Sequence, residues 1–81
     1  MKVRVLVRPK EGILDPQGQA VQRALPALGF ERVGAVHVGR LIELEVDRNG
    51  DAAAVESEVA RMCEQLLANP LIESYEVEVL G

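Results

Sequence analysis

The 81-residue sequence predicts a single α+β domain spanning 1–81, in which a mostly antiparallel four-stranded sheet carries two helices on one face. Four segments favour strands, three of them through a clear alternation of apolar and polar residues. Two further segments repeat apolar residues at helical spacing. Their order is strand, helix, strand, strand, helix, strand, which is the ferredoxin-like order and places the first strand between the third and the fourth.

The first strand runs from Lys2 to Arg8, with three valines on one side and mainly basic side chains on the other. A loop with a glycine follows, and then a helix start. The Asp15 side chain can accept from the free amides of a first helical turn, and Pro16 supplies a preset φ where no amide is needed. We therefore expect both residues to act as structural caps of the first helix.

The first helix carries an apolar stripe that continues to Leu28. Pro26 interrupts it, so we expect a kink or a tightened turn there. Gly29 is the predicted left-handed cap at the end of the helix.

Strands are expected over 33–39 and 40–46. The connection at Gly39–Arg40 lacks the usual hairpin residues, so it is either a tight turn or a bulge in one long bent strand.

Asn49–Gly50 then favours a turn, and Asp51 is the predicted cap of the second helix. Asn69 and Pro70 end that helix, and a last strand reaches to about Leu80. The inward stripe of the helix is expected to comprise Val55, Val59, Met62 and Leu66, widened by Cys63 and Leu67.

The open face of this sheet would be charged. Basic side chains of the central strand face glutamates of both neighbouring strands, so the charges satisfy one another. Leu6 and Leu41 lie among them, which indicates that part of this face meets another subunit.

Composition limits the possible partners. The formal net charge is -4 with nine basic and thirteen acidic residues, and aromatics make up 2% of the chain, so nucleic acid is a poor partner. No segment is long and apolar enough to cross a membrane. The hydrophobic content of 48% in so short a chain predicts association with another chain. A lone cysteine, with no secretory leader, favours a cytoplasmic protein.

The chain offers no recognisable catalytic set. His37 is the only histidine and has no evident partner for general-base chemistry. Cys63 lies on an apolar stripe, where a thiol behaves as a small hydrophobe. One cysteine and one distant histidine make no metal site, and neither glycine-rich phosphate fingerprint is present near Lys10. We expect no catalytic residue and no bound metal.

Several motifs, taken together, resemble one family. They are Pro9-Lys10, Leu14-Asp15-Pro16-Gln17-Gly18, Leu28-Gly29, Gly39-Arg40, Met62-Cys63 and the run from Leu66 to Glu73. The chain resembles, over nearly its whole length, the PurS family, the small subunit of phosphoribosylformylglycinamidine synthase (formylglycinamide ribonucleotide amidotransferase). Arg40 departs from the family, which more often has lysine there.

The resemblance implies a PurS-like fold and a noncatalytic subunit of a glutamine-dependent ligase in purine biosynthesis. In that family the small subunit is typically dimeric, so the resemblance implies a homodimer or higher homo-oligomer. The small subunit bridges a synthetase (PurL-type) and a glutaminase (PurQ-type) and supports ammonia transfer between them. ATP and magnesium belong to the synthetase, so no cofactor is expected on this chain. Candidate partner-binding residues are Pro9, Lys10, Glu11, Arg40, Leu6 and Leu41.

Two other functions remain open from the residues. An ACT-like module that senses a small molecule has the same element order, although such modules present a glycine-rich strand-to-helix loop where this chain has Leu14, Asp15 and Pro16. A free-standing enzyme with a site at His37 or Lys10 ranks below both.

Overall fold

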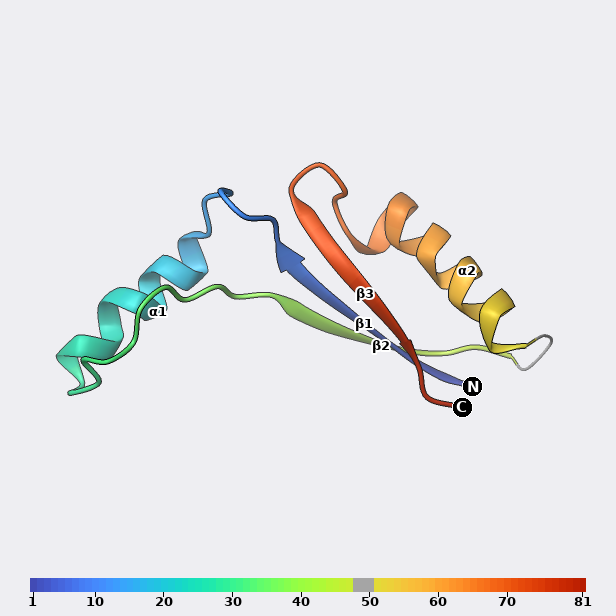
Figure 1. The fold of residues 1–81 in the computed structure, drawn as a ribbon, viewed down its shortest axis with the longest axis horizontal. Helices are drawn as coiled ribbons and strands as arrows, with labels where there is room; N and C mark the ends of the chain where they lie inside the picture. The colour runs from blue at the N-terminus through green and yellow to red at the C-terminus, as the bar shows by residue number, and fades with distance from the viewer. Residues whose placement is uncertain (48–50) are drawn as a thin grey trace.

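The computed structural model describes residues 1–47 and 51–81, so the turn predicted at Asn49–Gly50 lies outside the described residues. Its elements are β1 (Lys2–Pro9), α1 (Pro16–Ala27), β2 (Arg40–Glu45), α2 (Ala52–Met62), a π-helical turn η1 (Cys63–Leu67) and β3 (Glu73–Val79). The three strands lie in the order β2-β1-β3, and both pairs are antiparallel (Figure 1). The predicted α+β class and the central place of the first strand are confirmed.

The prediction of a four-stranded sheet is wrong, because 33–39 does not join the ladder. This segment runs back along α1 instead (Figure 1). The Val36 amide donates to Gln22 Oε1 at 3.2 Å, and the Val38 amide donates to an oxygen of Asp15 at 2.7 Å. Side chains of the α1 region therefore take the hydrogen bonds that a neighbouring strand would have taken. No hairpin forms at Gly39–Arg40.

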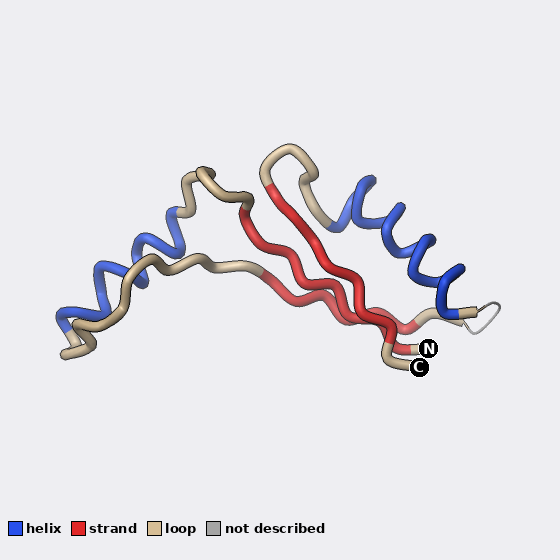
Figure 2. Tube along the Cα trace, viewed as in Figure 1, coloured by secondary structure: helices blue, strands red, loops and turns tan. Residues whose placement is uncertain are grey.

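The first helix does not cover the sheet, contrary to the prediction. Together with the returning segment it forms a projection, which we call the arm (16–39), that extends away from the end of β1 (Figure 2). The radius of gyration is 16.0 Å, whereas a compact domain of this length would have about 12 Å. The rest of the described chain, which we call the body, contains the sheet, α2 and η1.

The core of the body lies on one face of the sheet. Three valines of β1 are at most 2% exposed, and α2 with η1 packs over them. The buried residues are Val3, Val5, Val7, Val55, Val59, Cys63 and Ala68. All are aliphatic or small, as the near absence of aromatic residues requires. By contrast, Leu25 is the only residue of the predicted apolar stripe of α1 that is not exposed.

The turn η1 changes which residues face the core. The Ala68 amide donates to the carbonyl of Cys63, five residues back, at 3.0 Å, so one residue is inserted into the helical repeat. Ala68 is consequently buried, while Leu66 is 83% exposed. The prediction that Leu66 belongs to the inward stripe is wrong, because this wider turn rotates it away from the sheet.

The end of α1 tightens at Pro26, as expected from the sequence. The Gly29 amide donates to the Pro26 carbonyl and the Phe30 amide to the Leu25 carbonyl, each at 3.0 Å. This pair of bonds is a Schellman motif, and Gly29 has the positive φ of 97° that the motif requires. At the start of α2, Asp51 Oδ1 accepts from the Ala54 amide at 2.8 Å.

Candidate subunit interface

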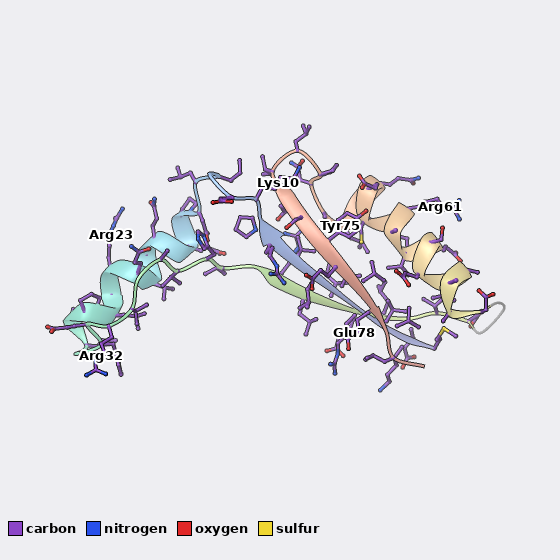
Figure 3. The ribbon with its side chains drawn as sticks, in the orientation of Figure 1. Lys10, Arg23, Arg32, Arg61, Tyr75 and Glu78 are labelled. Atoms are coloured by element: carbon purple, nitrogen blue, oxygen red, sulfur yellow. The ribbon has the colours of Figure 1, made fainter. Side chains whose placement is uncertain are left out.

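Three segments meet where the arm leaves the body, and we call this place the junction. They are the end of β1 at Pro9 and Lys10, the start of β2 at Gly39 and Arg40, and the segment 67–73. Figure 3 shows Lys10 beside the turn that precedes β3. The junction thus gathers residues that are distant in sequence.

Arg40 is the centre of the junction. Its guanidinium donates to both carboxylate oxygens of Glu73, at 2.7 and 3.1 Å, and to the carbonyl of Leu67 at 2.6 Å. The hydrogen bond to Glu73 raises the pKa of Arg40, and the same bond lowers the pKa of Glu73. Because a two-pronged pair needs a planar guanidinium, a lysine at this position could not reproduce it.

The Pro9–Glu11 segment is held at the other side of the junction. The Lys10 Nζ donates to the Pro70 carbonyl at 2.6 Å, and its backbone amide donates to the Ile72 carbonyl at 2.9 Å. Pro9 is half-buried at the end of β1, and Glu11 is exposed in the turn that follows. Asn69 Oδ1 accepts from the Leu71 amide at 3.1 Å. Asn69 therefore caps this turn, while Ala68 is the residue at the end of η1.

Asp15 connects the start of α1 to the returning segment 33–39. Its Oδ1 accepts from the Gly18 amide at 3.0 Å, as a helix cap does, and its Oδ2 accepts from the Val38 amide at 2.7 Å. These bonds lower the pKa of Asp15, and His37 Nδ1 lies 3.9 Å from Oδ2. Pro16 occupies the first helical turn. A side chain at Gly18 would collide with Asp15 and with the carbonyl of Val36. In the Asp-Pro-Gln-Gly motif, Asp15 therefore caps the helix, and Gly18 leaves room for the returning chain to pass close to α1.

Gly39 brings the arm against the sheet. A Cβ at this position would collide with the Val7 carbonyl and lie 3.3 Å from Arg8 Cα. No larger residue fits between the returning chain and β1 without movement of one backbone. At Gly34, by contrast, nothing lies within 4 Å of an added Cβ.

Exposed apolar side chains gather on separate parts of the chain. The arm and the loop before it carry five of them, namely Leu14, Val21, Leu28, Phe30 and Val33, which are 41–71% exposed. The π-helical turn η1 carries Leu66, and the turn between η1 and β3 carries Leu71 and Ile72. Leu66 and Leu71 are each 83% exposed, more than any other large hydrophobic residue that the structure describes.

On the open face of the sheet, basic side chains of β1 lie opposite glutamates of both neighbouring strands, as predicted. Arg4 lies between Glu43 and Glu78 on the neighbouring strands. Leu6 and Leu41 are directly opposite one another, at 37% and 51% exposure. These two residues form a small apolar island on a charged face.

Among the described residues, we find no cluster of side chains that is arranged as a catalytic or metal-binding site. The His37 side chain is 65% exposed, and Cys63 is buried with a pKa raised by desolvation. Within 1–47 and 51–81, no three His, Cys, Asp or Glu side chains are placed to hold a metal ion. A cleft of about 310 Å³ lies under the arm, between Ile13, Leu14 and Val38 on one side and Arg40 and Glu73 on the other. Its lining is mainly apolar.

The six candidate partner-binding residues therefore fall in two places. Pro9, Lys10 and Arg40 meet at the junction with Glu11 beside them, and the two leucines share the open face. Sequence reasoning missed the bonds to Glu73 and Pro70, and it missed the exposure of Leu71. The only available signal was two apolar residues after a proline, outside any repeating pattern.

A family model described as PurS, phosphoribosylformylglycinamidine (FGAM) synthase, matches residues 2–81. The chain belongs to the PurS family. The PurS subunit of the synthase from Bacillus subtilis is 45% identical over 78 residues, which cover 96% of this chain and 90% of that protein. The corresponding subunit from Methanocaldococcus jannaschii is 40% identical and covers 96% and 93%.

Solved structures of PurS proteins have the same fold as this chain. The crystal structure of PurS from M. jannaschii matches with a TM-score of 0.87 at 39% identity, covering 99% of this chain and 95% of that one. A chain in the structure of PurLQS from Thermotoga maritima matches with a TM-score of 0.86 at 32% identity, covering 98% and 95%. The family resemblance and the membership in FGAM synthase, an enzyme of purine biosynthesis, are confirmed, and the ACT-like alternative is not favoured.

Among the described residues, none of the helices has the length and apolar character that spanning a membrane requires.

Proposed function

We propose that this chain is the noncatalytic small subunit of FGAM synthase and that it bridges a PurL-type synthetase and a PurQ-type glutaminase. The supporting observation is its match, over nearly the whole of both chains, to a chain in the structure of PurLQS from T. maritima. The separate apolar surfaces of the arm and of the body support a role that is based on contacts.

In the proposed complex the other subunits perform the chemistry. The glutaminase releases ammonia from glutamine, and the synthetase uses ATP and magnesium to convert formylglycinamide ribonucleotide to its amidine. This chain binds neither ATP nor magnesium and contributes to the guarded transfer of ammonia by holding the two enzymes together. Its single cysteine, buried and unpaired, fits a reducing cytoplasm.

The proposal includes self-association through the arm. The amides of Val36 and Val38 both point toward α1, as alternate residues of an extended segment do. By the same alternation, the amides of Ala35 and His37 point away from α1 and offer an edge for pairing. A second copy can add its own segment 33–39 to this edge and cover the exposed stripe of α1, which removes an edge that would otherwise aggregate.

The adaptor role is tested by reconstitution. The synthetase and the glutaminase are mixed with and without this chain, and amidine formation is measured with glutamine and, separately, with free ammonia. We expect the glutamine-dependent rate to require this chain and the ammonia-dependent rate to change much less. An equal glutamine-dependent rate without the chain would refute the proposal.

Self-association is tested by light scattering at micromolar concentration. We expect a dimer or a larger oligomer for the parent and a smaller species for Ala35→Pro, which removes one outward amide. Arg61→Ala, on α2 and far from the arm, is the control and should match the parent. A parent that is strictly monomeric would contradict this part of the proposal.

A further inference from the structure

The outer edge of β2 has no neighbouring strand among the described residues, since the sheet order is β2-β1-β3. Just after β2, the Val46 amide donates to the Met1 carbonyl, and the N-terminal amine donates to the Val46 carbonyl, each at 2.9 Å. Val46 therefore faces β1, and alternation along the strand turns the amides of Leu41, Glu43 and Glu45 outward. An edge of this kind is a template for another strand.

This outer edge continues into the arm. Val36 and Val38 direct their amides toward α1, just as the even-numbered positions of β2 direct theirs toward β1. The amides of Ala35 and His37 consequently lie on the same side of the chain as the outward amides of β2. Figure 1 shows the returning segment and β2 as one extended run without a turn between them. We call residues 35–45 the long edge.

The inner face of the sheet is only half covered at β2. The three valines of β1 are at most 2% exposed, but Ile42, Leu44 and Val46 remain half-buried. Figure 1 shows α2 on the β3 side of the sheet, and α2 packs against β3. In the ferredoxin-like order a fourth strand lies beside β2 and extends this face. The chain's own segment 33–39 does not take that place, because it lies in the arm.

We infer that the long edges of two copies pair antiparallel around a two-fold axis at Leu41, so that each copy supplies the fourth strand of the other's sheet. This inference rests on the proposed self-association through the arm and assigns its pairing. The second copy's segment 33–39 lies beside β2, and its β2 lies beside Ala35 and His37. Exchange of one identical element between two copies is a low-cost route to a dimer.

Apolar side chains of the inner face favour this register. With Leu41 on the axis, Val38 lies opposite Leu44 of the second copy, and Val36 lies opposite Val46 of the second copy. The apolar surface of β2 is thereby continued by the valines of the added segment. A slip by a single residue would turn these valines to the charged face, so the pattern specifies the pairing.

The open face fits the same register. The two Leu41 side chains meet at the axis, and each already lies opposite Leu6 of its own sheet, so four leucines form one row and shield one another from water. His37 lies opposite Glu45 of the second copy, where its imidazole N–H can donate to the carboxylate. An axis at Arg40 would instead place two guanidinium groups side by side, which is unfavourable.

Engineered cysteines test the register. Hydrogen-bonded neighbours on antiparallel strands have Cα atoms about 5.5 Å apart, which a disulfide can span. Leu41→Cys should therefore form a disulfide-linked dimer under mild oxidation. Glu45→Cys is the matched control, since its two copies would lie about 27 Å apart. The parent is the blank, because Cys63 is 0% exposed.

Denaturing gel electrophoresis measures the covalent dimer. We expect it to be at least about 10-fold more abundant for Leu41→Cys than for Glu45→Cys. A mixture of His37→Cys and Glu45→Cys chains should crosslink as well, whereas a mixture of His37→Cys and Glu43→Cys chains should crosslink much less. Light scattering and thermal unfolding are recorded for every variant, so that a loss of fold is recognised.

Opposite charges test the two-fold axis. Leu41→Glu or Leu41→Lys alone would place like charges together, so we expect each to weaken self-association about 10-fold in light scattering. A mixture of the two variants in equal amounts should recover the association of the parent. Leu80→Glu is the control, because Leu80 is 44% exposed after β3, the opposite edge strand, and this variant should associate like the parent.

Three results would overturn the inference. They are equal crosslinking of Leu41→Cys and Glu45→Cys, crosslinking of His37→Cys chains with one another instead, and no recovery on mixing the two charged variants. Failure of the proposed function is distinguishable. A monomeric parent would refute self-association itself, whereas a dimeric parent without the disulfide at position 41 refutes only this pairing. The glutamine-dependent rate reports the adaptor role separately.

Discussion

The body and the arm are held together by different forces. In the body, apolar side chains of β1 are covered by α2 and η1, and seven residues are buried. In the arm, Gly18 is the only buried residue of α1, and the returning segment is attached by hydrogen bonds that its amides donate to the side chains of Asp15 and Gln22. The comparison teaches that a small chain can place its stability in one part and leave the apolar surface of the other for a partner.

The largest expected effect comes from a charge in the core of the body. Val5→Asp would bury a carboxylate at a site that is 0% exposed, costing about 3–5 kcal/mol, which is comparable to the whole stability of a domain of this size. We expect circular dichroism to report an unfolded chain. Val21→Asp is the matched change in the arm, at 41% exposure, and should leave the fold intact but weaken self-association in light scattering. Equal damage from both would remove the distinction between the two parts.

The next effect tests the contact between arm and sheet. Gly39→Ala would force a Cβ against the Val7 carbonyl, and we expect the unfolding temperature to fall by about 5–15 °C. Gly34→Ala has open space and should change it by no more than about 3 °C. Similar temperatures for the two variants would show that the sheet yields at Gly39.

A third prediction concerns the arm alone. Asp15→Ala removes the acceptor of the Gly18 and Val38 amides, so we expect hydrogen exchange at both to accelerate at least about 10-fold. Amides of β1, such as that of Val5, should keep the parent's protection. Slower exchange in the arm, or equal acceleration throughout the chain, would contradict a locally fastened arm.

Low pH should weaken the hydrogen bonds that Asp15 makes in the arm and those that Glu73 makes at the junction. The pKa values of Asp15 and Glu73 are lowered from ordinary values of 3.8 and 4.5 by hydrogen bonds to the ionised carboxylates. Their stabilisation is therefore present above those ordinary values and is lost as the pH falls through the lowered ones. Thermal unfolding between pH 7 and pH 2 should show a decline below about pH 4.5. The decline should be smaller in a variant carrying both Asp15→Asn and Glu73→Gln.

The smallest change in unfolding temperature is expected from substitutions at the junction. Arg40→Lys keeps the charge but loses the two-pronged contact with Glu73 and the bond to the Leu67 carbonyl. Since the pair is partly exposed, the unfolding temperature should fall by only about 1–4 °C. Glu73→Gln should produce a similar change, and the loss in the double variant should be smaller than the sum of the two single losses. Additive losses would mean that the two side chains act independently.

Local signals in the sequence were read correctly. The cap at Asp15, the left-handed Gly29 and the alternation of β1 depend on neighbours within a few residues, and the structure has all three features. Alternation also places Leu6 and Leu41 on one face, because side-chain direction in a strand follows from the pattern alone.

Contacts between residues that are distant in sequence could not be predicted from the sequence. The pattern of 33–39 resembles that of a strand, but it does not specify which groups take its hydrogen bonds, and these are side chains of the α1 region. The pairing of Arg40 with Glu73 spans 33 positions. The inserted residue at η1 reverses the expected orientation of Leu66 because helical periodicity assumes a constant repeat.

Because Cys63 is buried, the reactivity of its thiol can be used to follow opening motions of the body. The thiol is 0% exposed beneath η1, so a thiol reagent can modify it only when α2 and η1 lift from the sheet. Its labelling rate therefore reports the opening of the body, without any introduced probe.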